Sequence, residues 1–375
     1  MAFPATFAEF LGNTSTVESL RASIAAGRFP HSLILAGPRG AGKYTLALML
    51  TMALECQKKP REVAADGREL AAFCGVCANC TRIAASASLE EKVAEAVAAR
   101  EDMRETDKKE TRVLVQTHPD VLVIPPDPPQ LLVKLGQIRT MIQRAAYLPV
   151  EAPAKVFLIT SSAFMKEAAN SLLKLLEEPP AYAHLILLAE NLGELLPTIR
   201  SRCGVARLGS LPAEEISALL QQQAAGSAKE RELIARLSEG AVGRALSFNL
   251  PAYVAARNDA LLLLRTVERS GEHTALFKST ETYRAGAEGQ EKTVALLRAL
   301  ASVLEDILLT QAGAAERVRN VDVRADLERM ASTFSFAWLE RAVRGLDAVQ
   351  SGMRRNLLRG LSLDAFTMEM EESSV

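Results

Sequence analysis

The chain has 375 residues, of which 49 % are hydrophobic and only 5 % aromatic, a composition that favours helices over sheet sandwiches. This length leaves room for about two or three domains. The formal net charge of −1 excludes a global electrostatic attraction to nucleic acid or to a membrane surface, so any nucleic-acid contact must come from a local patch.

The first residues and the cysteines indicate the cellular compartment. The start, MAFPATFAEFLGN, has neither the basic flank nor the continuous apolar core of a signal peptide. No window reaches the ~18 apolar residues of a membrane span. The five cysteines are clustered, which argues against a secreted disulfide framework. We therefore expect a cytoplasmic protein with no membrane contact.

The first chemical motif is a phosphate-binding loop, GPRGAGKYT, at residues 37–45. It follows the apolar run 32–37, predicted as a buried strand, and precedes a stretch with helical periodicity, which is the context that supports such a loop. The candidate nucleotide-binding residues are Gly37, Gly40, Gly42, Lys43 and Thr45. Tyr44 stands where a Ser or Thr hydroxyl would bind the magnesium of the nucleotide. Binding of ATP or ADP is therefore left open.

A cysteine-bearing excursion follows, at about residues 56–83. In CGVCANC, Cys74, Cys77 and Cys80 are each spaced by two residues, and Cys56 precedes them. Four thiolates form the closed tetrahedral shell of a structural zinc site, which has no open position for catalysis. Reduced buried thiols or a redox pair are the alternative.

The rest of the first half alternates between strand and helix signals. A highly charged segment, 84–112, is typical of a solvated helix or a mobile arm. Strand-like residues 113–127 follow, and further strands are predicted at 155–160 and 184–190. The stretches between them have helical periodicity, and the second ends at a Pro-Pro pair. This alternation predicts an α/β fold with a parallel, doubly wound sheet.

Strand signals disappear after about residue 208. Residues 209–254 predict short helices of a small lid domain, and residues 255–375 predict longer amphipathic helices. Leucine stripes of this kind indicate a helical core, with any outward-facing stripe available for oligomer contacts.

Five motifs occur in an order that resembles the bacterial clamp-loader family, an AAA+ group: GPRGAGK, CGVCANC, THPDV, NSLLKLLEEPP and PTIRSRC. The resemblance runs from about residue 8 to 250. Beyond that it rests on helical content and the ending NLLRGLSLDAF. It implies an AAA+ P-loop domain at 1–208 with the zinc module and the charged insertion, then the lid and a helical collar. The implied function is loading of a sliding clamp onto primed DNA as part of DNA polymerase III.

The family contains gamma/tau motor subunits and delta-prime subunits, and the chain resembles the delta-prime type at three positions. Thr160 and Ser161 stand where motor subunits carry the Asp-Glu pair that holds magnesium and polarises water. Tyr44 replaces the magnesium-binding hydroxyl. Gly243 stands where motor subunits carry a second sensor arginine, and the adjacent Arg244 would point about 100° away on a helix. The resemblance therefore implies a subunit without ATP hydrolysis of its own.

The resemblance also implies a role for Arg202 in Ser-Arg-Cys, as an arginine finger that reaches the nucleotide of a neighbouring motor subunit. Arg200 is a weaker alternative. The implied partners are the gamma/tau and delta subunits in a hetero-oligomer, the sliding clamp, and primed DNA contacted through its phosphates.

Two alternatives stay open. The chain could be an active gamma/tau-like ATPase if Glu167, Glu177 or Glu178 served in place of the missing acids. It could also be a zinc-bearing adaptor with a degenerate phosphate-binding loop and no part in replication.

Overall fold

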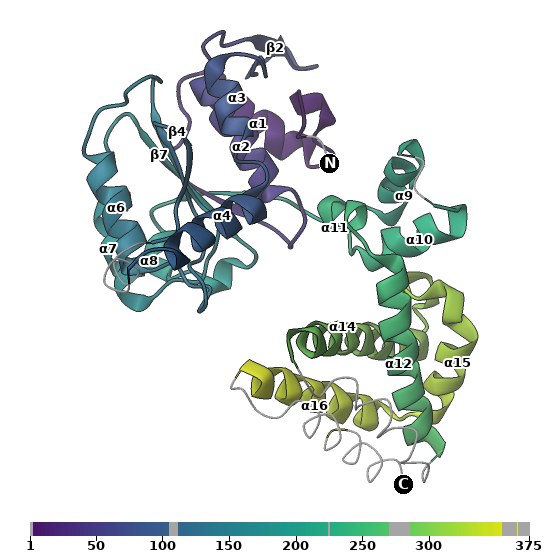
Figure 1. The fold of residues 1–375 in the computed structure, drawn as a ribbon. Coiled ribbons are helices and arrows are strands. Elements are labelled where there is room, and N and C mark those ends of the chain that lie inside the picture. The colour runs from purple at the N-terminus through teal and green to yellow at the C-terminus, as the bar shows by residue number, and fades with distance from the viewer. Residues whose placement is uncertain (1–2, 105–111, 224–225, 270–285, 355–365, 367–375) are drawn as a thin grey trace. The chain divides into compact units, whose positions relative to one another are not determined.

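The computed structural model describes residues 3–104, 112–223, 226–269, 286–354 and 366 (Figure 1). The chain divides into two compact units, Met1–Leu211 with Ala241–Arg244, and Pro212–Gly240 with Ala245–Val375. Part of the charged insertion and most of the ending NLLRGLSLDAF lie outside the described residues. Each unit is described below by itself.

The first unit is built on a six-stranded sheet with the order β4-β5-β6-β7-β1-β8. Its strands are β1 (Ser32–Ala36), β4 (Val115–His118), β5 (Val121–Ile124), β6 (Lys155–Ile159), β7 (Ala183–Ala189) and β8 (Gly204–Arg207). Every neighbouring pair is parallel except β4 and β5. The central strands are buried along their whole length, as expected for parallel strands with helices on both faces. The predicted α/β fold with a mostly parallel sheet is therefore confirmed.

The strand-like stretch 113–127 forms two antiparallel strands instead of one run. The turn between β4 and β5 contains Pro119, which has no amide hydrogen to continue a ladder. Asp120, which is 3 % exposed, follows in the turn. Its carboxylate accepts hydrogen bonds from the backbone amides of Val150, Glu151 and Ala152, at 2.8, 2.8 and 3.0 Å. The buried acid thus fixes the turn against the loop that enters β6.

Two apolar cores cover the two faces of the sheet. Successive side chains of a strand point to opposite faces. Leu33 and Leu35 of β1 accordingly belong to one core, and Ile34 belongs to the other. The helices of this unit are α1 (Thr14–Ala25), α2 (Lys43–Glu55), α3 (Ala78–Ala84), α4 (Leu89–Glu101), α6 (Leu135–Ala145), α7 (Lys166–Glu177) and α8 (Pro197–Arg200). Helices α1, α2 and α3 pack on one face of the sheet, and α6 and α7 on the other (Figure 1).

The cysteine-bearing excursion contains a small hairpin that the sequence did not predict. It consists of β2 (Arg61–Val63) and β3 (Glu69–Ala71), which pair antiparallel. The hairpin is attached to α1 through Arg21, whose guanidinium donates to Ala71 O at 2.9 Å and to Glu62 at 2.5 Å. The excursion therefore packs on the sheet domain through its second strand.

The second unit is helical throughout its described residues. Its helices are α9 (Ala213–Gln222), α10 (Ala228–Leu237), α12 (Leu250–Arg269), α14 (Gly286–Gln311), α15 (Arg324–Thr333) and α16 (Phe336–Arg354), while α11 (Val242–Leu246) lies at the division between the units. Leucines of α12 and α14 pack around Trp338, which is 2 % exposed. The predicted helical C-terminal region is confirmed. Among the described helices, none is long and apolar enough to cross a membrane.

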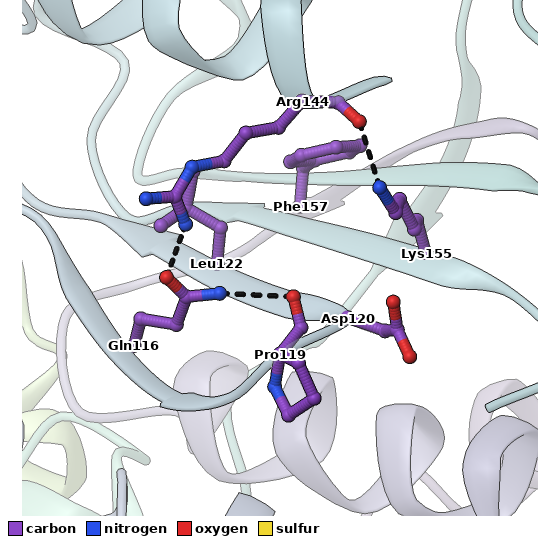
Figure 2. A pocket seen from close by; sticks show the side chains of 7 residues that line it. All are labelled: Gln116, Pro119, Asp120, Leu122, Arg144, Lys155 and Phe157. Atoms are coloured by element: carbon purple, nitrogen blue, oxygen red, sulfur yellow. Dashed lines mark hydrogen bonds between the residues drawn. The ribbon is translucent and has the colours of Figure 1, made fainter. Parts of the chain in front are cut away.

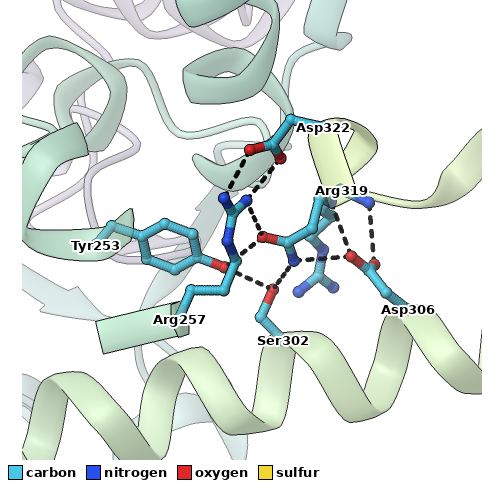
Figure 3. Close-up of polar contacts among 7 residues, drawn as sticks. Tyr253, Arg257, Ser302, Asp306, Arg319 and Asp322 are labelled. Atoms are coloured by element: carbon cyan, nitrogen blue, oxygen red, sulfur yellow. Dashed lines mark hydrogen bonds and ion pairs between the residues drawn. The ribbon is translucent and has the colours of Figure 1, made fainter. Parts of the chain in front are cut away.

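A buried polar network holds the loop between α14 and α15 in place (Figure 3). Arg257 forms two 2.6 Å bonds to Asp322. Asp306, which is fully buried, accepts from the amides of Arg319 and Asn320 at 2.9 and 2.8 Å. Arg319 also pairs with Glu239 at 2.8 Å, just beyond the end of α10. The segment after α10 and the loop between α14 and α15 are therefore joined within this unit.

Candidate functional site

The phosphate-binding loop connects β1 to α2, as the motif predicted. Gly40 and Gly42 have φ values of +84° and +81°, in the left-handed region that favours glycine. A Cβ on Gly40 would lie 2.9 Å from the backbone nitrogen of Arg244, and one on Gly42 would lie 2.9 Å from the ring of Phe10. Both glycines are therefore required by conformation and by close packing.

A cavity of about 680 Å³ opens beside this loop. Of the five predicted nucleotide-binding residues, four line it: Gly40, Gly42, Lys43 and Thr45. Gly37 does not line the cavity, but its carbonyl accepts from Lys43 Nζ at 2.6 Å. Burial lowers the pKa of Lys43, while the nearby charge of Glu190 acts in the opposite direction. The lysine is thus held at the loop, where it and the loop amides offer a site for phosphate.

Tyr44 contacts a different part of the domain. Its hydroxyl donates a 2.7 Å hydrogen bond to the carbonyl of Ser86, and burial raises the pKa of the phenol. The Ser86 hydroxyl in turn bonds to Thr117 of β4 at 2.7 Å. A protonated phenol engaged in this way holds the start of α2 to the segment before α4, and its oxygen is committed to that bond.

The carboxyl end of β6 brings hydroxyl groups to the cavity and no carboxylate. Thr160 and Ser161 both line it, as their places in the sequence predicted. The hydroxyl of Ser161 accepts from the amide of Ala163 at 3.1 Å. Hydroxyl groups cannot supply the carboxylate that a P-loop enzyme uses to hold magnesium.

Two carboxylates that the sequence reasoning missed also line the cavity. Glu190 directly follows β7, and Glu194 accepts a hydrogen bond from Ser162. The strand order brings them there, because β7 lies between β6 and β1 and parallel strands have their carboxyl ends on the same side of the sheet. In contrast, Glu167, Glu177 and Glu178 are not among the residues that line the cavity, and all three are exposed.

Gly243 of α11 closes one side of the loop. Its amide donates to Gly40 O at 2.8 Å, and a Cβ at this position would lie 2.9 Å from the same oxygen. Gly243 lines the cavity, whereas Arg244 is exposed and is not among the lining residues. The position predicted to lack the second sensor arginine thus lies against the phosphate-binding loop.

Arg202 lies just after α8, away from the cavity lining. Its guanidinium contacts Glu177 at 2.6 and 3.0 Å and donates to Thr198 O at 2.9 Å, and its side chain is 34 % exposed. The neighbouring Cys203 packs partly buried against the second core, and burial raises the pKa of its thiol to about 11.

The four predicted zinc ligands come together. The sulfur atoms of Cys56, Cys74, Cys77 and Cys80 all lie within 4.8 Å of one another. Cys56 caps the end of α2, and Cys77 caps the start of α3. Two of the four cysteines are therefore positioned by helix ends. A tetrahedral shell with Zn–S bonds of about 2.3 Å places sulfurs roughly 3.8 Å apart, so the cluster needs little contraction to fit zinc.

The hydrogen bonds of the cluster favour thiolate at one of these cysteines. Desolvation acts to raise the pKa of Cys74, but hydrogen bonds from the Val76 and Cys77 amides outweigh it and lower the pKa to about 6. The Cys77 amide approaches Cys74 Sγ at 3.3 Å. Thiolate is the form that binds metal. Burial raises the pKa of Cys80, but a bound zinc ion would hold its thiol deprotonated, so the four sulfurs suit a structural zinc ion.

The relationship to known families follows from two matches. Residues 12–212 match the family described as DNA polymerase III, delta subunit. The chain belongs to this family. Residues 255–359 match a second family, described as DNA polymerase III, delta subunit, C terminal. The resemblance to clamp-loader subunits that the motifs predicted is confirmed.

Similar proteins carry consistent names. The delta' subunit of DNA polymerase III from Escherichia coli K12 is 28 % identical over 319 residues, covering 85 % of this chain and 81 % of the relative. The gamma/tau subunit from Mycobacterium tuberculosis H37Rv is 30 % identical over 218 residues, or 58 % of this chain, which spans 31 % of that relative's length. Among solved structures, a gamma subunit-related protein from Thermotoga maritima has a TM-score of 0.42 at 18 % identity, covering 96 % of this chain and 100 % of that one.

Proposed function

We propose that this subunit acts as the delta-prime component of a bacterial clamp loader and hydrolyses no ATP itself. The observation that carries the proposal is the cavity beside Lys43. The phosphate-binding loop lines this cavity, but the Tyr44 hydroxyl is bonded to Ser86. The end of β6 supplies the hydroxyl groups of Thr160 and Ser161 and no carboxylate. Magnesium would therefore lack both its usual hydroxyl ligand and its usual carboxylates. Any ATP or ADP would be held by the lysine, the loop amides and Thr45.

Arg202 would supply the arginine finger to a neighbouring gamma/tau motor subunit. Its only described ion pair is with Glu177, whose side chain is 49 % exposed. A solvent-exposed ion pair contributes only about 0–1 kcal/mol. The guanidinium can therefore leave Glu177 for the more concentrated charge of a nucleotide γ-phosphate with little loss. In that position it would neutralise charge that develops during phosphoryl transfer.

The remaining parts would hold the assembly together. The zinc ion would be structural and would join the excursion to α2 and α3. The lid at 209–254 and the collar at 255–375 would form contacts with the motor and delta subunits. The complete loader would then place a sliding clamp on primed DNA, and DNA would be contacted through backbone phosphates.

Reconstitution with motor and delta subunits, clamp and primed DNA tests the proposal through the rate of ATP hydrolysis. An arginine finger is worth roughly 10³–10⁵ in the best-studied GTPases. Arg202→Ala should therefore nearly abolish ATP hydrolysis at the one motor site that Arg202 serves. The assembly, measured by gel filtration, should be preserved. Arg200→Ala is the matched control, because Arg200 is an exposed arginine at the end of α8, two residues before Arg202. Unchanged hydrolysis with Arg202→Ala would remove the finger from the proposal.

Two further outcomes would favour the alternatives. If the isolated chain hydrolysed ATP and Lys43→Ala abolished the activity, the chain would be a motor. Glu190→Gln would then test whether Glu190, which lines the cavity and whose charge acts on the lysine, is the carboxylate in that role. If the chain formed no complex with motor and delta subunits, a zinc-bearing adaptor outside replication would become the better description.

A further inference from the structure

A second cavity lies at the amino ends of β5 and β6, whereas the phosphate-binding loop follows the carboxyl end of β1. Figure 2 shows the residues that line this cavity. The cavity has a volume of about 230 Å³. Its lining residues are Gln116, Pro119, Asp120, Leu122, Arg144, Lys155 and Phe157. Leu122 and Phe157 provide apolar walls, and the polar groups come from the ends of the strands and of α6.

Two cations in this cavity have no carboxylate partner among the described residues. Lys155 is only 7 % exposed, and its Nζ donates to the carbonyl of Arg144 at 2.9 Å. The guanidinium of Arg144 donates to the side-chain oxygen of Gln116, and its remaining N–H groups are left for another acceptor (Figure 2). Lys155 is a buried charge without a counter-charge, which is costly, and Arg144 is a partly exposed cation beside it, so the two are suited to an external anion.

The single acid in the lining does not satisfy the two cations. Both oxygens of Asp120 accept backbone amides of the loop at 150–152. Counting Arg144, Lys155 and Asp120, the formal charge of the cavity is +1. That charge matches one carboxylate better than a doubly charged phosphate group.

An exposed apolar loop lies next to the cavity. Tyr147, Leu148 and Val150 are 72, 72 and 74 % exposed and lie just beyond the end of α6 at Ala145. The loop is held in place, because Asp120 binds its amides and Tyr182 donates to the carbonyl of Ala145 at 3.1 Å. A fixed loop that keeps three large apolar side chains in water is typical of a protein-binding surface.

We propose that this surface binds a short segment of a partner protein, with one carboxylate in the Arg144–Lys155 cavity and apolar side chains against the loop. Nucleic acid is the poorer occupant. Residues 145–154 contain no Lys or Arg, and their one charged residue, Glu151, is already paired with Arg82. A cavity for one anion also lacks the run of cations that a phosphate backbone requires. This inference does not depend on the proposed role in clamp loading.

A random library of ten-residue peptides displayed on phage, selected on the immobilised full-length protein, provides the test. Selected peptides should share Asp or Glu next to Leu, Ile or Phe. The consensus peptide is then synthesised and its affinity measured by fluorescence anisotropy. Arg144→Gln and Lys155→Met should each weaken binding at least about tenfold. Arg139→Gln, an exposed arginine on the same helix that does not line the cavity, should leave affinity unchanged.

A change in the peptide separates loss of the contact from loss of the fold. Replacing the acidic residue of the peptide by its amide should weaken binding to the wild-type protein at least as much as either substitution. The same replacement should weaken binding to the Arg144→Gln protein, which keeps Lys155, by a smaller factor. The proposal would be overturned if the selected peptides contained no acid. It would also be overturned if the consensus peptide bound the Arg144→Gln and Arg139→Gln proteins with equal affinity. A DNA oligonucleotide whose binding is lost with Arg144→Gln and kept with Arg139→Gln would overturn it as well, since the anion would then be a phosphate.

Discussion

The charged helix α4 is attached to the sheet domain through an ion pair with the buried carboxylate of Asp127, and substitution of Asp127 tests this attachment. Its side chain is fully buried, 2.7 Å from Arg100 Nη1 on α4 and 3.3 Å from Lys134 Nζ. The side chains of these cations are 12 and 20 % exposed. Asp127→Asn removes the carboxylate that the two cations share. Loss of one partner from a buried ion pair costs about 3–5 kcal/mol, and we expect a loss of stability of this size.

A double-mutant cycle with Arg100 separates the attachment of α4 from the local role of Asp127. Arg100→Gln should cost less, because Asp127 then keeps Lys134. The coupling between positions 100 and 127 should be about 1–3 kcal/mol. Lys92→Gln on the same helix is the matched control, since its exposed pair with Glu95 should contribute less than about 0.5 kcal/mol.

Urea unfolding of the zinc-loaded protein measures these differences, and hydrogen exchange of the α4 amides shows whether the helix itself is released. The Asp127→Asn protein should exchange faster across Leu89–Glu101 than the wild type. A cost below about 1 kcal/mol, or the same cost as Lys92→Gln, would refute the reasoning. The helix would then be a solvated arm held by its chain connections alone.

Three further predictions concern single groups. Tyr44→Phe removes the bond to Ser86 O and should destabilise the domain by about 1–3 kcal/mol in urea unfolding. Burial lowers the pKa of His184 below its usual value near 6.5, so the unfolded chain binds the proton more readily and stability must fall as pH drops below about 6.5. His184→Gln should flatten this decline by up to about 1.4 kcal/mol per pH unit in melts from pH 7 to 5. Cys77→Ser should reduce bound zinc, measured by metal analysis, from about one equivalent to near zero.

Much of the sheet domain could be predicted because its signals are local. The buried strands β1, β6 and β7 are continuous apolar runs, and the helices between them have apolar periodicity. The hairpin of the excursion could not be predicted in this way. All three residues of β2 are exposed, so no alternation marks the strand. The hairpin depends on Arg21 in α1, which is distant in sequence.

The candidate sites were predictable to the extent that chemistry and spacing coincide. In the cysteine motif and the glycine loop, the spacing of the residues in sequence already indicates their arrangement in space. The structure brings the four cysteines together at one place and the loop residues together at another. Glu190 and Glu194 were missed because each follows β7, which has no motif of its own, and only the strand order places them beside Lys43. The contact between Arg202 and Glu177 likewise joins the turn after α8 to the end of α7, two segments that no local pattern relates.

The replacement at Tyr44 has a structural consequence beyond the loss of a magnesium ligand. The phenol joins α2 to Ser86, and Ser86 is bonded to Thr117 at the edge of the sheet. A single Tyr44→Thr change would restore a hydroxyl but would leave the Ser86 carbonyl, on a residue that is 1 % exposed, without its donor. It would also leave hydroxyl groups at Thr160 and Ser161, so no carboxylate would be gained at the end of β6. A magnesium site of the usual kind would therefore require several coordinated changes, because the position that usually supplies the metal's hydroxyl ligand supports the fold here.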